Sequence, residues 1–421
     1  MASYGLTNQV LTLYLKAINI SEERIGIFMT LTLIGDTLIS YFLTWNADRI
    51  GRRVVMIIGT IMMFGAGIVF AVSSHFWILL VAAIIGVISP SGDETGPFKS
   101  VEEASIAHLT PHNHRPEIFA FHGLFATAGA ALGSLVCGVL VDYMNQNLGL
   151  EMEHCYRYIF MIYSGFSLIK LTLMLFLTNK CEVYVDNFIE EEQSDETSAL
   201  LPDSESTSDD EEVSGVKSGL SNTTRYYLPR LLAIFMLDSL GYGFMPSAWV
   251  VYYLKITLAL SASALGTLFF FTNSINAVSS LPSAYFSKLL GPVKAILFTQ
   301  VPSAFFFAMV PIFHTYLPVA GLLMLYYTTT TMDVVPRQVL LTSIMPKHEI
   351  TKVMGIVNIG KTFARCIGPV FTGKLAAHNK LYVGFYINGA CVLLADIIMA
   401  CNFLHLDSEI LTKQSIENHI D

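Results

Sequence analysis

The sequence predicts an all-α integral membrane protein whose twelve spans form two bundles of six helices. Apolar residues make up 53% of the 421 residues and charged residues only 14%, whereas soluble domains carry about 25% charged residues. The mean hydropathy is +0.56. The apolar residues also gather into runs close to the roughly 20 residues that a helix needs to cross a hydrocarbon core.

The predicted spans fall into two equal sets around a hydrophilic centre. The first set covers residues 4–16, 25–45, 54–74, 76–105, 117–141 and 158–178. The second set covers residues 230–254, 262–286, 292–312, 316–343, 352–376 and 381–403. We therefore expect an N-terminal six-helix bundle, an acidic disordered cytoplasmic loop, a C-terminal six-helix bundle and a cytoplasmic tail, at residues 1–178, 179–229, 230–404 and 405–421.

A charged segment lies between the second and third predicted spans, where we expect a short turn. It contains Asp48, Arg49, Gly51, Arg52 and Arg53. Arginines beside a span mark its cytoplasmic end, so this segment sets the orientation of the helices. The pattern Asp-Arg-x-Gly-Arg-Arg at this position resembles the signature loop of the major facilitator superfamily (MFS) of transporters.

The resemblance implies the MFS fold, with a gate at this turn and a solute site midway between the bundles. In the family fold the turn lies near the start of the eleventh helix, here about Thr351–Gly355. The carboxylate of Asp48 would meet the positive end of that helix and hold the bundles in the outward-open state. The run from Gly86 to Phe98 is similar to a fungal and bacterial subgroup of the superfamily that has no defined substrate.

An internal repeat supports the same fold, because parallel six-helix repeats around a midplane site are what the resemblance implies. Residues of the first half recur in the second as the pairs Tyr4 and Tyr242, Lys16 and Lys255, Pro111 and Pro346, Gly133 and Gly368, and Gly138 and Gly373. A dozen apolar residues precede Tyr242, whereas three residues precede Tyr4. We therefore expect the first helix to lack its cytoplasmic half; a helix that is short by nature is the alternative.

The positive charges beside the spans are unevenly distributed. With the charged turn placed inside, the same face receives Arg115, Lys180, Arg225, Arg230, Lys288, Lys294, Lys347 and Lys352. The other face receives Lys16, Arg24, Arg157, Lys255, Lys374 and Lys380. Because cytoplasmic loops are enriched in Lys and Arg, we expect both termini and the central loop to be cytoplasmic.

The central loop is acidic and poor in apolar residues, so we expect it to be disordered. Its segment 182–212 holds thirteen acidic residues and no Lys or Arg, which accounts for the formal net charge of −9. Nothing therefore points to nucleic acid. Glu196, Leu200 and Leu201 resemble an acidic dileucine signal, read by a sorting adaptor. This pattern predicts a vacuolar or lysosomal membrane, with the plasma membrane as the alternative.

Ionisable residues inside spans are costly to bury and usually face a polar cavity or a partner. We assign seven of them to a cavity for a solute and a coupling proton: Asp36, Asp93, Glu94, Asp238, Asp333, Lys361 and Arg365. The two cations lie on one helix face, where they either bind an anionic group or neutralise Asp238 or Asp333. Glu102, Glu103 and Arg337 are expected to form gating or packing ion pairs.

These features predict a secondary transporter that moves a small solute across the bilayer by alternating access, with proton coupling as one form of the hypothesis. The alternative is a non-transporting membrane sensor or scaffold that signals through its acidic loop. The sequence has no phosphate-binding loop, nucleophile elbow or metal-ligand spacing. We therefore predict no enzyme activity, cofactor or metal.

Overall fold

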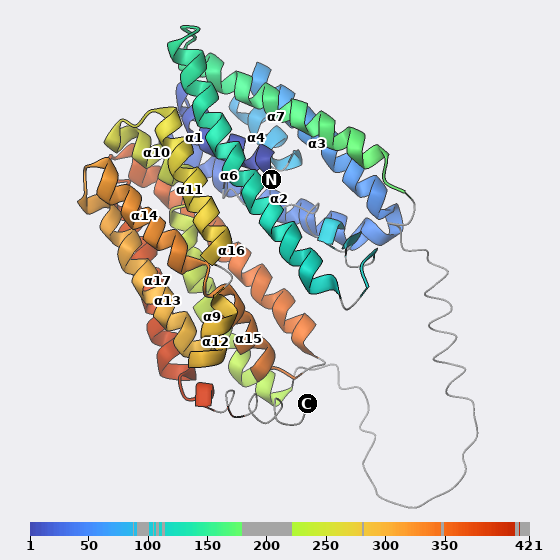
Figure 1. The fold of residues 1–421 in the computed structure, drawn as a ribbon, viewed down its shortest axis with the longest axis vertical. Helices are drawn as coiled ribbons and strands as arrows, with labels where there is room; N and C mark the ends of the chain where they lie inside the picture. The colour runs from blue at the N-terminus through green and yellow to red at the C-terminus, as the bar shows by residue number, and fades with distance from the viewer. Residues whose placement is uncertain are drawn as a thin grey trace, which may run out of the picture.

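The computed structural model describes residues 1–178, 221–279, 282–346 and 349–408, together with residue 412. The first range has gaps at 87, 91–100, 104, 107–108 and 112–113. The described chain is helical, with short connections between its helices (Figure 1). Because lipid offers no hydrogen-bond partner to the backbone, a chain that crosses a bilayer must satisfy its peptide groups within helices of this kind.

The N-terminal half contributes α1 (Ala2–Ala17), α2 (Glu22–Ile50), α3 (Arg52–Val72), α4 (Phe76–Ile85), α6 (Arg115–Gln146) and α7 (Met152–Leu175). The C-terminal half contributes α9 (Asn222–Phe244), α10 (Ser247–Leu258), α11 (Ala262–Ser279), α12 (Ser283–Leu290), α13 (Pro292–Met309), η3 (Val310–Ile312), α14 (Tyr316–Thr330), α15 (Val334–Ile344), α16 (Ile350–Ala377) and α17 (Val383–Phe403). Seven stretches of the described chain are long and apolar enough to cross a membrane by length and composition.

In the described part of the C-terminal half, three spans predicted as single helices are each built from two. Span 230–254 breaks between α9 and α10 at Pro246, and span 262–286 breaks between α11 and α12 before Pro282. Proline has no N–H to donate and disfavours helical geometry in the residue before it. Span 316–343 breaks at Thr331–Asp333, between α14 and α15. This last break lies beside the central cavity described below.

The prediction of a turn that covers the charged segment between the second and third spans is wrong, because the turn is much shorter. Helix α2 continues through the charged segment to Ile50, and only Gly51 separates it from α3. Gly51 has φ 102° and Gly291, at the start of α13, has φ 86°. Glycine adopts such angles readily because it has no Cβ. The two halves therefore make the same one-residue reversal, and we call the region around Gly51 and Gly291 the motif end of the molecule.

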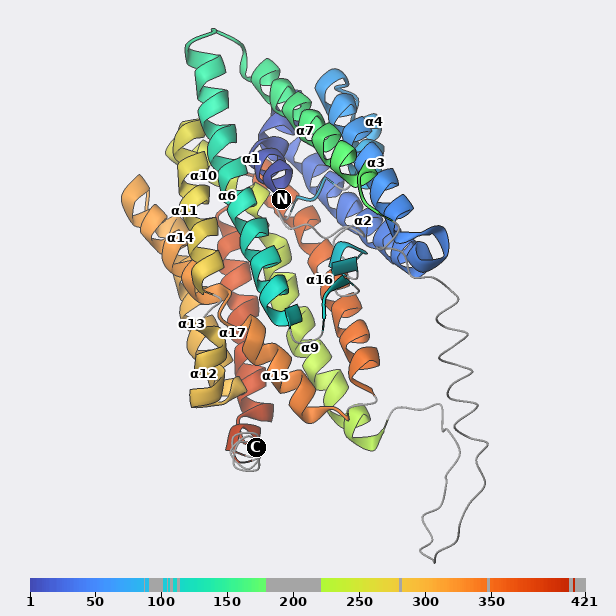
Figure 2. The same cartoon turned by 45° about the vertical axis from the view of Figure 1, so that its right-hand side comes forward.

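The two halves meet along α6 with α11 and along α2 with α16 (Figures 1 and 2). A Cβ atom at Gly26 would lie 2.4 Å from the carbonyl oxygen of Pro369, and one at Gly138 would lie 2.3 Å from that of Ala262. These contacts lie at the start of α2 and α11, opposite Gly51 and Gly291. We call this region the sealed end.

Candidate functional site

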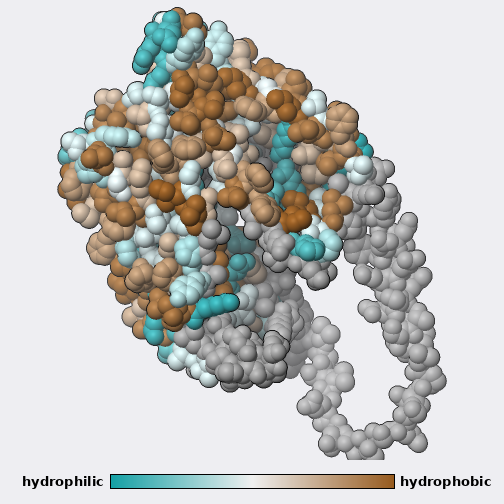
Figure 3. All heavy atoms as spheres, in the orientation of Figure 1, coloured by the Kyte–Doolittle hydropathy of each residue, from teal (hydrophilic) through white to brown (hydrophobic). Residues whose placement is uncertain are grey.

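A cavity of about 590 Å³ lies between the two halves. The described lining from the N-terminal half is Gly5, Asn8, Leu33, Ala130 and Ser134, whereas α9, α11, α14, α15 and α16, with Asp333 just before α15, supply its charged and aromatic residues. The space-filling view shows a hollow between the halves, with hydrophilic side chains at its depth (Figure 3). The charged residues of the described lining therefore all belong to the C-terminal half.

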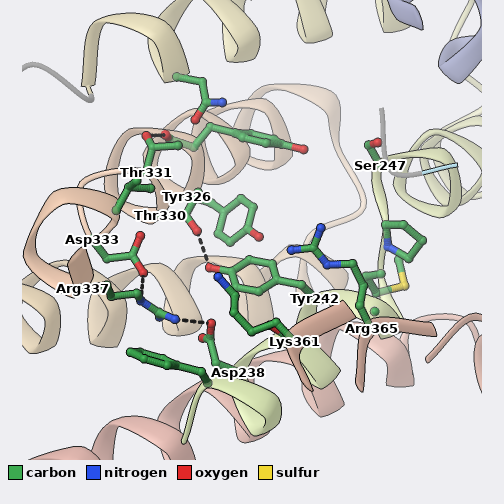
Figure 4. Close-up of a pocket in the computed structure, with 18 of the residues that line it drawn as sticks. Asp238, Tyr242, Ser247, Tyr326, Thr330, Thr331, Asp333, Arg337, Lys361 and Arg365 are labelled. Atoms are coloured by element: carbon green, nitrogen blue, oxygen red, sulfur yellow. Dashed lines mark hydrogen bonds and ion pairs between the residues drawn. The ribbon is translucent and has the colours of Figure 1, made fainter. Parts of the chain in front are cut away.

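A buried ion cluster joins two helices in the cavity wall. Arg337 donates from Nη1 to Oδ2 of Asp238 at 2.7 Å, and its Nε pairs with Oδ2 of Asp333 (Figure 4). The three side chains are 12%, 5% and 8% exposed. Asp333 immediately precedes α15, so Arg337 lies one turn later on the same face. The break in span 316–343 thus brings both carboxylates to one guanidinium.

Tyr242 connects this cluster to the neighbouring helices. Its hydroxyl lies 2.5 Å from Oγ1 of Thr330 and donates to Oε1 of Gln300 at 3.3 Å. Gln300 is completely buried, and its amide nitrogen donates to the carbonyl oxygen of Thr330 at 3.5 Å. These bonds fix the end of α14 against α9 and α13.

Lys361 and Arg365 extend from one face of α16 into the cavity, Lys361 beside Tyr242 and Arg365 toward the space near Ser247 (Figure 4). No described carboxylate forms an ion pair with either residue, and Nε of Arg365 is buried without a hydrogen-bond partner among the described atoms. The cavity wall therefore presents two cations that form no ion pair with Asp238 or Asp333, because both carboxylates pair with Arg337.

The other predicted site residues are placed differently. Asp36 is buried in α2, where Ser40 donates to it at 3.4 Å, and it is not among the described residues that line the cavity. Glu102 pairs with Lys170 at 2.9 Å. Asp93, Glu94 and the dileucine residues Glu196, Leu200 and Leu201 lie outside the described residues, as do the side chains of Asp48 and Arg49.

Within the charged motif, the described side chain of Arg53 donates from Nη2 to the carbonyl oxygen of Leu175 at 2.9 Å. This bond joins the first turn of α3 to the end of α7, inside one half. In the C-terminal half, Asp407 accepts from the backbone N–H groups of Val293 and Lys294 at 2.8 and 2.9 Å. Each half is thus tied together at its motif end by a different contact.

The sealed end contains polar contacts between the halves that the sequence did not suggest. Asp142, in the last turn of α6, accepts from the backbone N–H groups of Ala262 at 3.0 Å and Ser263 at 2.8 Å. Tyr252 donates to Glu22 at 3.0 Å, and Glu22 also pairs with Lys16. These groups close the cavity on that side.

Sequence reasoning missed Gln300, Asp396 and the contacts of Asp142. Gln300 and Asp396 are polar residues inside apolar spans, which is the signal that could have identified both. In the described part of the chain, no group of three or more His, Cys, Asp or Glu side chains has the arrangement of a metal site.

Comparison with known proteins assigns the chain to a family. A family model for the Major Facilitator Superfamily matches residues 1–226 and 230–418. An uncharacterized membrane protein of Saccharomyces cerevisiae is 48% identical over 430 residues, covering 100% of this chain and 94% of that protein.

Solved transporter structures share the fold. A D-xylose-proton symporter superposes with a TM-score of 0.68 at 16% identity, covering 94% of this chain and 92% of that one. A bacterial homolog of the human lysosomal transporter Spinster, in an inward-facing conformation, gives 0.68 at 12% identity, with 98% and 94% covered. The predicted all-α membrane fold is confirmed, and the chain belongs to the Major Facilitator Superfamily, as a secondary transporter.

Proposed function

We propose that this transporter carries a small solute with an anionic group, such as a carboxylate or a phosphate. The observation that supports this proposal is the pair of cations on α16, Lys361 and Arg365, which extend into the cavity without a described counter-ion. Among the described lining residues there are three cations and two carboxylates, and Arg337 is already shared by Asp238 and Asp333. An anionic solute would complete the charge balance.

The binding geometry follows from the helix. Residues four apart on α16 place an ammonium and a guanidinium one turn apart on the same face. Charge-assisted hydrogen bonds to a carboxylate or phosphate are shorter and stronger than neutral ones, and arginine can make two of them in parallel. The neutral part of the solute would lie against Tyr242 and the small residues of the N-terminal half.

The transport cycle would alternate between two openings of this cavity. We place the motif end on the cytoplasmic side, from the distribution of Lys and Arg, which puts both termini and the acidic loop there as well. The sealed-end contacts of Asp142 and Glu22 would break when the cavity opens to the other side. Asp48 would then hold α2 against the start of α16, and a proton gradient would supply the energy.

Residues Glu196, Leu200 and Leu201 would direct the protein to a vacuolar or lysosomal membrane through a sorting adaptor, with the plasma membrane as the alternative. Replacing the two leucines by alanine in a fluorescently tagged full chain should move it to the plasma membrane. An unchanged distribution would reject the signal, and a matched Ser194→Ala variant controls for other effects of changing the loop.

The anion site can be tested before the transported solute is identified. The purified chain in lipid nanodiscs is heated with carboxylates, phosphate esters, neutral sugars and organic cations in turn. A ligand that binds only the folded state raises its stability by about 2.7 kcal/mol at one hundred times its Kd. We expect stabilisation by anionic compounds alone.

The variants Lys361→Gln and Arg365→Gln should each weaken such a compound by roughly 10–150-fold, because each loses a charged hydrogen bond of about 1.5–3 kcal/mol. Lys374→Gln is the matched control, since Lys374 is exposed on the same helix. Stabilisation by neutral or cationic compounds that survives both cavity substitutions would reject the proposal. In proteoliposomes, uptake of the anionic compound at a rate that does not change with an imposed pH gradient would reject proton coupling. Binding of the compound without any uptake would favour the sensor alternative.

A further inference from the structure

A further buried carboxylate, outside the ion cluster, lies on a helix that does not line the cavity. Asp396, in α17, is 2% exposed, and its Oδ2 has no hydrogen-bond partner among the described atoms. It is flanked by Ala395 and Met399, which belong to the apolar core formed by α9, α13, α15, α16 and α17. An oxygen of a carboxylate is thus buried among apolar side chains without a described donor.

The contrast with Asp407 shows what a structural aspartate looks like here. Asp407 is completely buried, but each of its oxygens accepts a backbone N–H, from Val293 and Lys294. Both oxygens therefore have the hydrogen-bond partners that buried polar groups normally have. Oδ2 of Asp396 has no equivalent among the described atoms, so the ionised form of Asp396 bears much of the cost of leaving water, a cost that proteins normally reduce by pairing or protonation.

The charged groups that act on Asp396 are those of the ion cluster. Arg337 attracts it, whereas Asp238 from α9 and Asp333 beside α15 repel it. On α13 no ionisable residue occurs between Ala295 and Met309. Across α16, Lys361 and Arg365 are the ionisable residues that face the cavity side of the cluster. Three carboxylates thus interact with the guanidinium of Arg337, which is already bonded to two of them.

From this geometry we infer that Asp396 is the site of an exchangeable proton, bound and released as the Arg337 cluster rearranges. With the proton on a carboxylate oxygen of Asp396, Arg337 is left to Asp238 and Asp333, as observed. When the proton leaves, a third negative charge draws on the same guanidinium and weakens its hold on Asp238. The inference rests on the proposed transport function, for which it supplies the site of the coupling proton.

The proton is detectable directly, without a transported solute. The full chain in phospholipid vesicles is examined by infrared difference spectroscopy between about pH 6 and about pH 9, a range in which exposed carboxylates stay ionised. A buried carboxylic acid that loses its proton in this range loses its C=O stretch and gains the carboxylate bands. We expect this signal in the natural sequence, its loss in Asp396→Asn, and its return at a shifted frequency in Asp396→Glu.

Asp407→Asn is the matched control, because it removes a buried aspartate that already has two partners, and it should leave the signal intact. Monodisperse elution and unchanged helical circular dichroism establish that each variant is folded. A signal that persists in Asp396→Asn, or one absent from the natural sequence, would overturn the inference. So would displacement of the signal by sodium but not potassium, which would assign the site to a metal cation.

The proposal of a proton site at Asp396 and the proposal of an anion site on α16 can be rejected independently. The Lys361→Gln and Arg365→Gln variants alter the proposed solute site and should preserve a proton signal from Asp396. Asparagine mimics the protonated form of Asp396 at every pH, so anion binding by Asp396→Asn should not depend on pH. If this variant lost anion binding at high pH but not at low pH, the anion site would stand and the proton assignment would be contradicted.

Discussion

Removing the carboxylate of Asp142 should open the sealed end. This side chain accepts two backbone N–H groups at the start of α11, at 3.0 Å from Ala262 and 2.8 Å from Ser263. It therefore caps a helix of the opposite half, where a negative charge also favours the positive end of the helix dipole. In Asp142→Ala the cap is lost in the sealed state, whereas in the open state the same N–H groups would meet water.

The size of the effect follows from this difference. A helix cap contributes about 0.5–2 kcal/mol and a hydrogen bond to a charged group about 1.5–3 kcal/mol. The local hydroxyl of Ser261, which already accepts from Ala264 at 3.2 Å, compensates in part. We expect a net shift of about 1–3 kcal/mol, or roughly 5–150-fold, in the ratio of open to sealed molecules.

The shift can be measured by electron paramagnetic resonance distance measurements. Spin labels at Asn147 and His314, exposed on opposite halves near the sealed end, report its opening. Cys181 and the exposed Cys401 are replaced by serine to avoid extra labels. The longer-distance population should grow in Asp142→Ala, with Asp142→Asn intermediate because its amide oxygen still accepts one bond.

Asp407→Ala provides the control for this experiment. It removes the same kind of cap, from the start of α13, but Asp407 and α13 lie in one half. It should lower the free energy of unfolding without changing the distance between the labels. If Asp142→Ala folds normally and gives the distance distribution of the natural sequence, the contact does not hold the halves together.

Three further changes test other parts of the structure. Arg337→Ala leaves two buried carboxylates unpaired and should lower the free energy of unfolding by about 3–5 kcal/mol, which chemical denaturation measures; adding Asp238→Asn should recover part of the loss. Gly373→Ala places a Cβ 2.6 Å from the backbone of α2 and should populate the open state in the spin-label assay, whereas Gly355→Ala, which meets no atom within 4 Å, should not. Asp48→Asn should alter the rate of conformational exchange more than ligand affinity; a pure affinity defect would contradict its role as a gate.

Much of the fold could be predicted because the bilayer restricts what the chain can form. Apolar runs of spanning length must be helices, and the repeat relates one half to the other. The helix breaks were harder, since Thr331–Asp333 contains neither proline nor glycine. The one-residue reversal at Gly51 was also missed, because charged residues continue a helix as readily as they form a loop.

The candidate site was only partly predictable. Charge inside a span identified Asp238, Asp333, Lys361 and Arg365, all of which line the cavity. The same rule selected Asp36, which is buried away from it. Spacing along one helix shows which residues share a face, but the direction of that face depends on packing between helices. Arg337 was for this reason expected in a gating or packing pair, although its ion pairs lie in the cavity wall.

The charged residues that line the cavity are unequally distributed between the two halves, and this distribution affects how the selectivity for solutes can change. The N-terminal half contributes no charged residue to the described lining, only small and neutral ones such as Ala130 and Ser134. A larger side chain at Ala130, which is half-buried, would shorten the longest solute that fits and leave the proposed ionic anchor on α16 untouched. At Gly5 no such change is open, because a Cβ there would lie 2.2 Å from the carbonyl oxygen of Ala130. On the proposed function, a substitution in the N-terminal half would therefore change the length of the accepted solute while Lys361 and Arg365 stay in place.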